Sequence, residues 1–234
     1  MALTKVIGAG VGSLTEDLAL SDSDKIKLGA GSDLQLYHDG SHSYIDEVGT
    51  GSLYVRASII RWTNADGSET LGGVDADGGW FLKANNSNAL VIDTNGHVTK
   101  PLQSAFHGTP SAKLENFAIG QYNNVNFATE RFDRNADYNA GGSPSAFTAP
   151  VTGVYQLNYH IYLQSVDTSA TYIQFSIKTS NDEYVTIIDP NFSSDIAYYH
   201  MTMSVLADMD ANDTAYVRMY QQGGDAQLDV ATNS

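Results

Sequence analysis

The sequence predicts an all-β protein, and two observations carry that prediction. Turn residues, above all Asp-Gly and Asn-Gly pairs that tolerate a positive φ, recur through the first hundred residues and leave only short runs between them. Apolar and polar residues then alternate strictly from Tyr155 to Leu163, which indicates a strand with one buried and one wet face. No long helical pattern occurs; residues 112–116 could make one helical turn at most, because Gly and Pro residues surround them.

The first hundred residues are expected to form a series of very short strands. The clearest candidates are residues 25–28, 34–37, 53–56, 80–83, 90–93 and 97–100. Strands of this length bury little apolar surface and expose their edges, so a single chain built from them would be marginally stable. Three chains wound around one axis would cover those edges. We therefore predict a trimeric β-repeat shaft over residues 21–100.

The aromatic residues divide the chain into two parts. Seven of the eight Phe and eleven of the fourteen Tyr lie beyond residue 100, whereas the first hundred residues are rich in Gly, Ser, Asp and Asn. The larger core is therefore expected in the second part, residues 101–234. Pro101 breaks strand continuity, and we place the junction at residues 99–103.

The second part carries a series of short motifs in a fixed order. They are Ala105 and Phe106, then Val125 and Phe127, then an Asn-rich turn, then Phe147-Thr148-Ala149-Pro150, and then Gly153-Val154-Tyr155. In this order the motifs resemble the C1q-like family, whose fold is a trimeric antiparallel jelly roll shared with tumour-necrosis-factor ligands. The resemblance spans residues 102–234 and implies a C1q-like head.

Two positions depart from the family pattern. Residues 209–217 are similar to the family's hairpin into a late strand, but Asn212 stands where Gly is usual. Asn tolerates the left-handed conformation that such a turn needs, so the hairpin is still expected. The family's closing Phe-x-Gly-x-Leu strand has no counterpart before Ser234, and we expect the last strand of the jelly roll to be missing.

A second resemblance concerns the shaft. Residues 25–57 and 85–98 are similar to the short β-repeats in fibre and appendage proteins of tailed bacteriophages, especially those of marine cyanobacteria. The resemblance implies a homotrimeric virion fibre or appendage located on the tail or elsewhere outside the particle. Residues 1–20 would then attach it to other virion proteins, and the head would bind a host-surface glycan or protein.

Composition excludes several other classes. The net charge of −15 argues against nucleic acid, which requires clustered Lys and Arg. No apolar run is long enough to insert in a membrane, and the start of the chain is too Gly-broken and acidic for a signal peptide. The chain has no Cys, which excludes thiolate metal sites and disulfides.

Metal and catalytic sites are weakly indicated. His38 and His42 flank a polar turn and could form a ring of imidazoles in a trimer, although two exposed histidines are the simpler interpretation. Asp208, Asp210 and Asp213 are the alternative, because some C1q-like heads hold structural calcium; a solvated hairpin is again simpler. We predict no cofactor. No Gly-x-Ser-x-Gly elbow occurs, so no enzymatic activity is expected, with a depolymerase as the minor alternative.

Tyrosines in polar company are the better candidates for recognition, because the ring can stack on a sugar while the hydroxyl forms hydrogen bonds. The candidate receptor-binding residues are Tyr122, Tyr138, Tyr198, Tyr199, Tyr216 and Tyr220. Core packing and the trimer seam are alternative roles for each of them. For the whole chain, the alternatives to a receptor-binding fibre are a purely structural virion component (collar, baseplate or head fibre) and a secreted C1q-like lectin.

Overall fold

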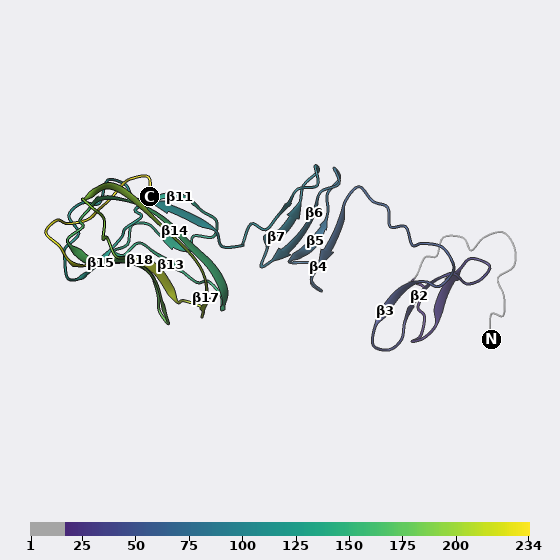
Figure 1. Ribbon diagram of the computed structural model, residues 1–234. Helices are drawn as coiled ribbons and strands as arrows, with labels where there is room; N and C mark the ends of the chain where they lie inside the picture. The colour runs from purple at the N-terminus through teal and green to yellow at the C-terminus, as the bar shows by residue number, and fades with distance from the viewer. Residues whose placement is uncertain (1–16) are drawn as a thin grey trace, which may run out of the picture. The chain divides into compact units, whose positions relative to one another are not determined.

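The computed structural model describes residues 17–234 (Figure 1). Most of the predicted attachment segment, residues 1–20, lies outside the described residues. Every regular element within residues 17–234 is a strand, all the strand pairings there are antiparallel, and no helix is present. The prediction of an all-β fold is confirmed, and residues 112–116 form no helical turn. None of the described segments is a helix that could cross a membrane.

The first sheet is a three-stranded meander within residues 17–58. Its strands are β1 (Lys25–Leu28), β2 (Leu34–His38) and β3 (Ser43–Glu47), in the order β1-β2-β3. Gly40 turns the chain between the second and third strands at a φ of +97°. Tyr37 and Tyr44 stack across β2 and β3 with ring centroids 4.7 Å apart. Within residues 17–58 no second layer covers the sheet, and Ile26 and Leu28 are exposed.

A five-stranded meander follows. Its strands, in spatial order, are β4 (Ile60–Thr63), β5 (Thr70–Val74), β6 (Trp80–Ala84), β7 (Ser87–Ile92) and β8 (Val98–Thr99). Gly73 of β5 lies so close to β4 that an added Cβ would be 2.3 Å from the carbonyl oxygen of Ile60, so β5 requires Gly there. Trp62 and Trp80 lie 6.4 Å apart on a face that remains exposed to solvent.

The predicted strand at residues 53–56 is wrong for the single chain. Residues 52–59 form no strand, and no backbone hydrogen bond connects them to the rest of residues 17–234. The pattern is that of a strand, but no strand in residues 17–234 pairs with it. The described residues divide into two compact units after Ser58, inside the predicted shaft. The three-part organisation into residues 1–20, 21–100 and 101–234 stays a prediction.

The head is built from the remaining strands. They are β9 (Phe106–Thr109), β10 (Tyr122–Asn124), β11 (Thr129–Asp133), β12 (Tyr138–Asn139), β13 (Ala146–Thr148), β14 (Gly153–Val166), β15 (Ala170–Thr179), β16 (Glu183–Ile188), β17 (Ile196–Met209), β18 (Thr214–Gly223) and β19 (Asp229–Val230). One sheet has the order β12-β13-β18-β15-β16, with β10 also paired to β18. A second has the order β17-β14-β19, and β9 pairs with β11.

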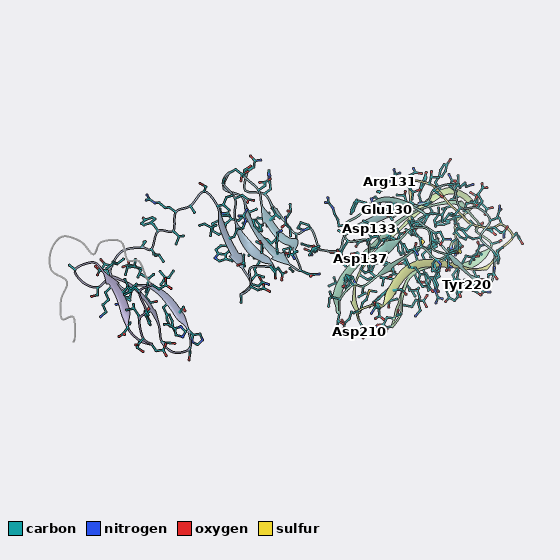
Figure 2. The ribbon with its side chains drawn as sticks, turned by 180° about the vertical axis from the view of Figure 1, so that it is seen from behind. Glu130, Arg131, Asp133, Asp137, Asp210 and Tyr220 are labelled. Carbon is teal, nitrogen blue, oxygen red and sulfur yellow. The ribbon has the colours of Figure 1, made fainter. Side chains whose placement is uncertain are left out.

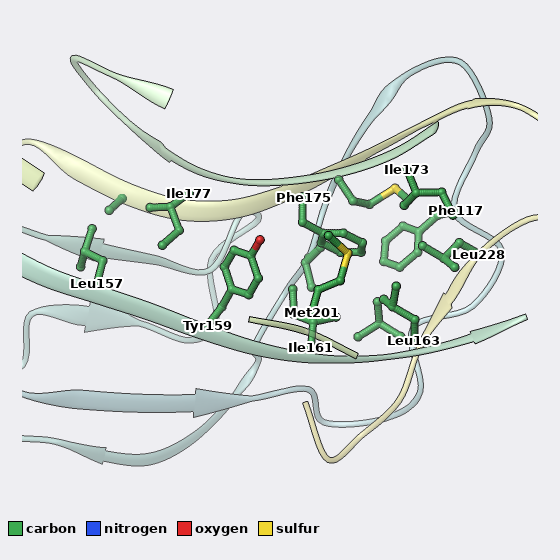
Figure 3. Packing of buried hydrophobic residues seen from close by; sticks show 14 of the residues in the cluster. Phe117, Leu157, Tyr159, Ile161, Leu163, Ile173, Phe175, Ile177, Met201 and Leu228 are labelled. Atoms are coloured by element: carbon green, nitrogen blue, oxygen red, sulfur yellow. The ribbon is translucent and has the colours of Figure 1, made fainter. Parts of the chain in front are cut away.

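The core of the head lies between its two larger sheets. Leu157, Tyr159, Ile161 and Leu163 are buried while the residues between them face outward, so the predicted alternation along β14 is confirmed. Figure 3 shows these side chains packed against Ile173, Phe175 and Ile177 of the opposite sheet. The period of two in each strand thus places one face of each sheet in a common core.

The hairpin between β17 and β18 has the predicted turn. Asn212 has a φ of +75°, the left-handed conformation that Asn tolerates. The Asp213 carboxylate accepts hydrogen bonds from the Asp210 amide at 2.9 Å and from the Asn181 side chain at 2.6 Å. The turn is therefore fixed by its own side chains.

The end of the chain requires a correction. We expected no final strand, because the Phe-x-Gly-x-Leu pattern is absent. The structure has the two-residue strand β19, in which Asp229 and Val230 pair with Gln164 and Leu163 of β14. Buried Leu228 and Val230 supply the apolar contacts that hold this short strand. Next to this pair, the Tyr162 carbonyl accepts a hydrogen bond from the Ala231 amide at 2.9 Å, and no other strand within residues 17–234 pairs with that edge of β14.

Candidate functional site

Three tyrosines form a row on the outer face of the β18-containing sheet. In β18, Ala215, Val217 and Met219 face the core, so the residues between them point outward. Tyr122 of β10 lies opposite Tyr220 of β18 with ring centroids 5.1 Å apart, and Tyr220 lies 6.0 Å from Tyr172 of β15. We call Tyr122, Tyr172 and Tyr220 the tyrosine platform. Two of its members were predicted from sequence, and Tyr172 was missed.

Amide side chains surround the platform. Gln174 is the cross-strand neighbour of Tyr220 and lies 3.4 Å from the Tyr122 hydroxyl. The Tyr220 hydroxyl donates to Gln222 at 2.9 Å. These groups keep further donors and acceptors free, because an amide has more hydrogen-bonding positions than these contacts use. Ring faces and amides therefore occur together on one sheet surface.

An ion pair fixes the edge of the platform. The Arg218 guanidinium contacts both oxygens of Glu183 at 2.9 and 2.5 Å, and its Cζ lies 3.8 Å above the Tyr122 ring centroid. The hydrogen bonds from Arg218 lower the pKa of Glu183, and those to Glu183 raise the pKa of Arg218. Both groups therefore stay charged near neutral pH, and the stacked guanidinium holds the Tyr122 ring in place.

The other four predicted tyrosines lie outside the tyrosine platform. Tyr138 is buried, stacks on Phe106 at 4.6 Å and donates its hydroxyl to the Phe127 carbonyl, so it belongs to the core. Tyr198 stacks on Tyr162 on the other sheet, and Tyr199 lies beside Phe192. Tyr216 is on the same strand as Tyr220, opposite Lys178.

A signal for Tyr172 was present in the sequence. Residues 170–179 alternate, with Ile173, Phe175 and Ile177 on one face and Tyr172 and Gln174 on the other. The alternation would have placed Tyr172 on an outer face. Its adjacency to Tyr220 depends on the pairing of β15 with β18, which only the fold reveals.

The outer face of the β14–β17 pair is a second surface. His160 and His200 are 3.2 Å apart through their ring nitrogens, and Tyr162 stacks on Tyr198 at 5.5 Å. Val154 and Leu206 are 67% and 69% exposed on the same two strands. Exposed apolar and aromatic side chains therefore lie together on this face. No other sheet of the head covers them.

The predicted metal ligands do not form a metal-binding group within residues 17–234 of one chain. In residues 17–234, no group of three or more His, Asp and Glu side chains could hold a metal ion. His38 lies 3.2 Å from Ser43, and His42 is 4.0 Å from Asp39. The Asp210 and Asp213 carboxylates accept hydrogen bonds at the hairpin turn, and Asp208 faces outward beside Val154. A ring of imidazoles formed by three chains, and structural calcium, stay predictions.

The two antiparallel sheets packed around one core define a jelly-roll module. The C1q domain model matches residues 106–234, more than half of the chain, and the protein therefore belongs to the C1q family. C1q domains typically form homotrimers and bind ligands, and they are binding or structural modules rather than enzymes.

Among solved structures, the globular domain of zebrafish complement 1qA protein is similar to this chain. The two are 17% identical, the match covers 55% of this chain and 92% of that one, and the TM-score is 0.38. No curated protein matches the chain.

Proposed function

We propose that this protein is a homotrimeric fibre or appendage of a phage virion, whose C1q head binds a glycan on the host surface. The tyrosine platform carries the proposal. Three ring faces in a row, with Gln174, Gln222 and Arg218 around them, suit a saccharide: its apolar ring face stacks on tyrosine while its hydroxyls pair with amides and guanidinium. A protein receptor is the alternative partner.

Trimer formation is supported by surfaces that one chain leaves uncovered. Trp62 and Trp80 are 48% and 52% exposed on a single-layer sheet, and the β14–β17 face exposes Val154 and Leu206. Apolar surface of this kind favours association with other chains. Three copies of the platform on one particle would gain affinity through avidity, so each site can be weak.

The virion setting rests on the resemblance of residues 25–57 and 85–98 to phage fibre repeats. Residues 1–20 would attach the protein to other virion proteins in this arrangement. A purely structural role, in which the head closes the trimer without binding, is the second candidate, and the uncovered β14–β17 face favours it. The two are distinguished by binding, since only the first requires the platform.

The test is binding of the full-length protein to an array of bacterial surface polysaccharides. Tyr220→Ala is expected to weaken binding at least tenfold, because it removes the central ring of the platform. Tyr54→Ala, an equally large change at an exposed position outside the head, is the matched control and should leave binding unchanged. Unaltered binding by Tyr220→Ala, with the oligomer intact, would contradict the proposed site; no binding by the unmodified protein would favour the structural role.

A further inference from the structure

Two histidines lie close together on the outer face of the β14–β17 pair. His160 of β14 is paired with Thr202, and His200 of β17 is paired with Tyr162, so the two histidines are diagonal neighbours across the ladder. The Nε2 atom of His200 is 3.2 Å from the Nδ1 atom of His160, and the ring centroids are 4.3 Å apart. Both side chains are exposed, so an ion in solution can reach them.

The spacing of these two nitrogens is that of a chelating pair. A zinc ion bound by imidazole lies about 2.0–2.1 Å from each nitrogen. Two such nitrogens are about 2.9 Å apart when the angle at the ion is a right angle, and about 3.3 Å apart when it is tetrahedral. The observed separation of 3.2 Å falls between these values. A common ion therefore needs the rings to turn toward it, but it needs no change in the distance between the two nitrogens.

The side chains around the pair do not oppose a cation. Neither β14 nor β17 contains a Lys or Arg, and the single acidic residue of the two strands is Asp208. Next to the histidines on the same face lie Asn158, Thr202 and Ser204, which are neutral. The whole chain has a net charge of −15. A divalent cation therefore meets no positive side chain from these strands and is attracted by the overall charge.

The two strands hold the histidines in a fixed relation. They pair with each other from Gly153 to Val166 of β14, and the residues that follow the two histidines, Ile161 and Met201, are 0% and 3% exposed in the core. A second imidazole held this close to the first raises the effective concentration of ligand, which strengthens binding without further contacts. The pair lies over the β14–β17 ladder, so it requires no residue along the other edge of β14.

We propose that His160 and His200 bind a divalent metal ion that prefers nitrogen ligands, with Zn²⁺ as the representative, through Nδ1 of the first residue and Nε2 of the second. Imidazole suits Zn²⁺, Ni²⁺ and Cu²⁺, whereas Mg²⁺ and Ca²⁺ prefer oxygen ligands. Two protein ligands are fewer than the four of a structural zinc site, so water completes the coordination on the exposed side. This site is separate from the tyrosine platform, which lies on β10, β15 and β18.

Zinc titration of the full-length protein tests the proposal. After a chelator has been applied and removed, isothermal titration calorimetry should show binding of Zn²⁺, and Mg²⁺ should not compete. His160→Gln and His200→Gln should each weaken binding at least tenfold, because a single imidazole loses the gain from chelation. His97→Gln is the matched control. It changes an exposed histidine beside Asp93, outside the head, and should leave the affinity unchanged.

Thermal unfolding provides a second readout. An ion that binds the folded head and not the unfolded chain stabilises the head. Zn²⁺ should therefore raise the unfolding midpoint of the head in the unmodified protein and in His97→Gln, but not in His160→Gln or His200→Gln. Midpoints measured without metal establish that the variants fold. Absence of Zn²⁺ binding by the unmodified protein would overturn the proposal. Equal affinity in His160→Gln, or loss of binding in His97→Gln, would overturn the assignment of the ligands.

Discussion

The five-stranded sheet of β4–β8 and the head are both antiparallel and both use tight turns, yet only the head has a core. Trp62 and Trp80 remain about half exposed in the single-layer sheet, whereas Phe147 and Phe175 of the head are 2% and 0% exposed. A sheet buries one face only when a second layer covers it. Strand pattern alone therefore does not produce stability. The head contains its second layer, whereas the sheets within residues 17–99 are single layers.

The largest expected effect separates the two regions directly. Phe175→Ala should destabilise the head by about 3–5 kcal/mol, because it leaves a cavity between the sheets. If the first region lacks a core of its own, Trp80→Ala in a monomeric form should cost about 1 kcal/mol or less. Urea denaturation followed by near-ultraviolet circular dichroism measures both. Equal losses in the free energy of unfolding at the two positions would show that the two regions do not differ in their cores.

A buried carboxylate is the next largest contribution within the head. Asp167 accepts hydrogen bonds from the amides of Ser169, Asp225 and Ala226, and so joins the β14–β15 turn to the loop after β18. Burial raises its pKa, but the hydrogen bonds from Ala226, Ser169 and Asp225 outweigh burial and lower the pKa to about 2. Asp167→Asn should therefore destabilise the head by about 1–2 kcal/mol.

The same carboxylate predicts a pH dependence. Its pKa in the folded state lies below 3.8, the ordinary value for an aspartate, so its contribution to stability is complete above pH 3.8 and is lost as the pH falls through about 2. Denaturation midpoints measured between pH 5 and pH 2 should decline less in Asp167→Asn than in the unmodified protein. Parallel declines would show that other groups govern acid stability.

The smallest expected effect concerns two turns, one in the head and one in the β4–β8 sheet, that each contain a residue with a positive φ. Asn212→Ala should cost the head about 1 kcal/mol, because Ala tolerates a φ of +75° less well than Asn does. Gly96→Ala imposes similar strain in the single-layer sheet, where φ is +85°. Thermal unfolding of the head should shift with the first change only. A shift of the head transition with Gly96→Ala would mean that the two regions unfold together.

Local chemistry allowed much of the fold to be predicted from sequence. The alternation of β14, the left-handed turn at Asn212 and the strands β1 and β2 depend on neighbouring residues, and each was confirmed. Residues 53–56 were wrong because a strand also needs a partner edge, which sequence pattern does not reveal. The short strand β19 was missed because its two residues carry no periodic signal.

The candidate site was only partly predictable for the same reason. Tyr122 and Tyr220 were identified by residue type, but Tyr138 has similar sequence surroundings and lies in the core. The platform forms because β10, β18 and β15 are neighbours, although they are far apart along the chain. Figure 2 shows Tyr220 and Asp210 at different ends of the head, so the platform and the β17–β18 turn are separate surfaces.

The most direct test of the central claim, that the chain completes its layers by association, is the solution mass of the intact protein. Light scattering at micromolar concentration should give three times the 25.2 kDa mass of one chain. A stable monomer of 25.2 kDa would contradict the trimeric fibre and the claim that association covers the single-layer sheets.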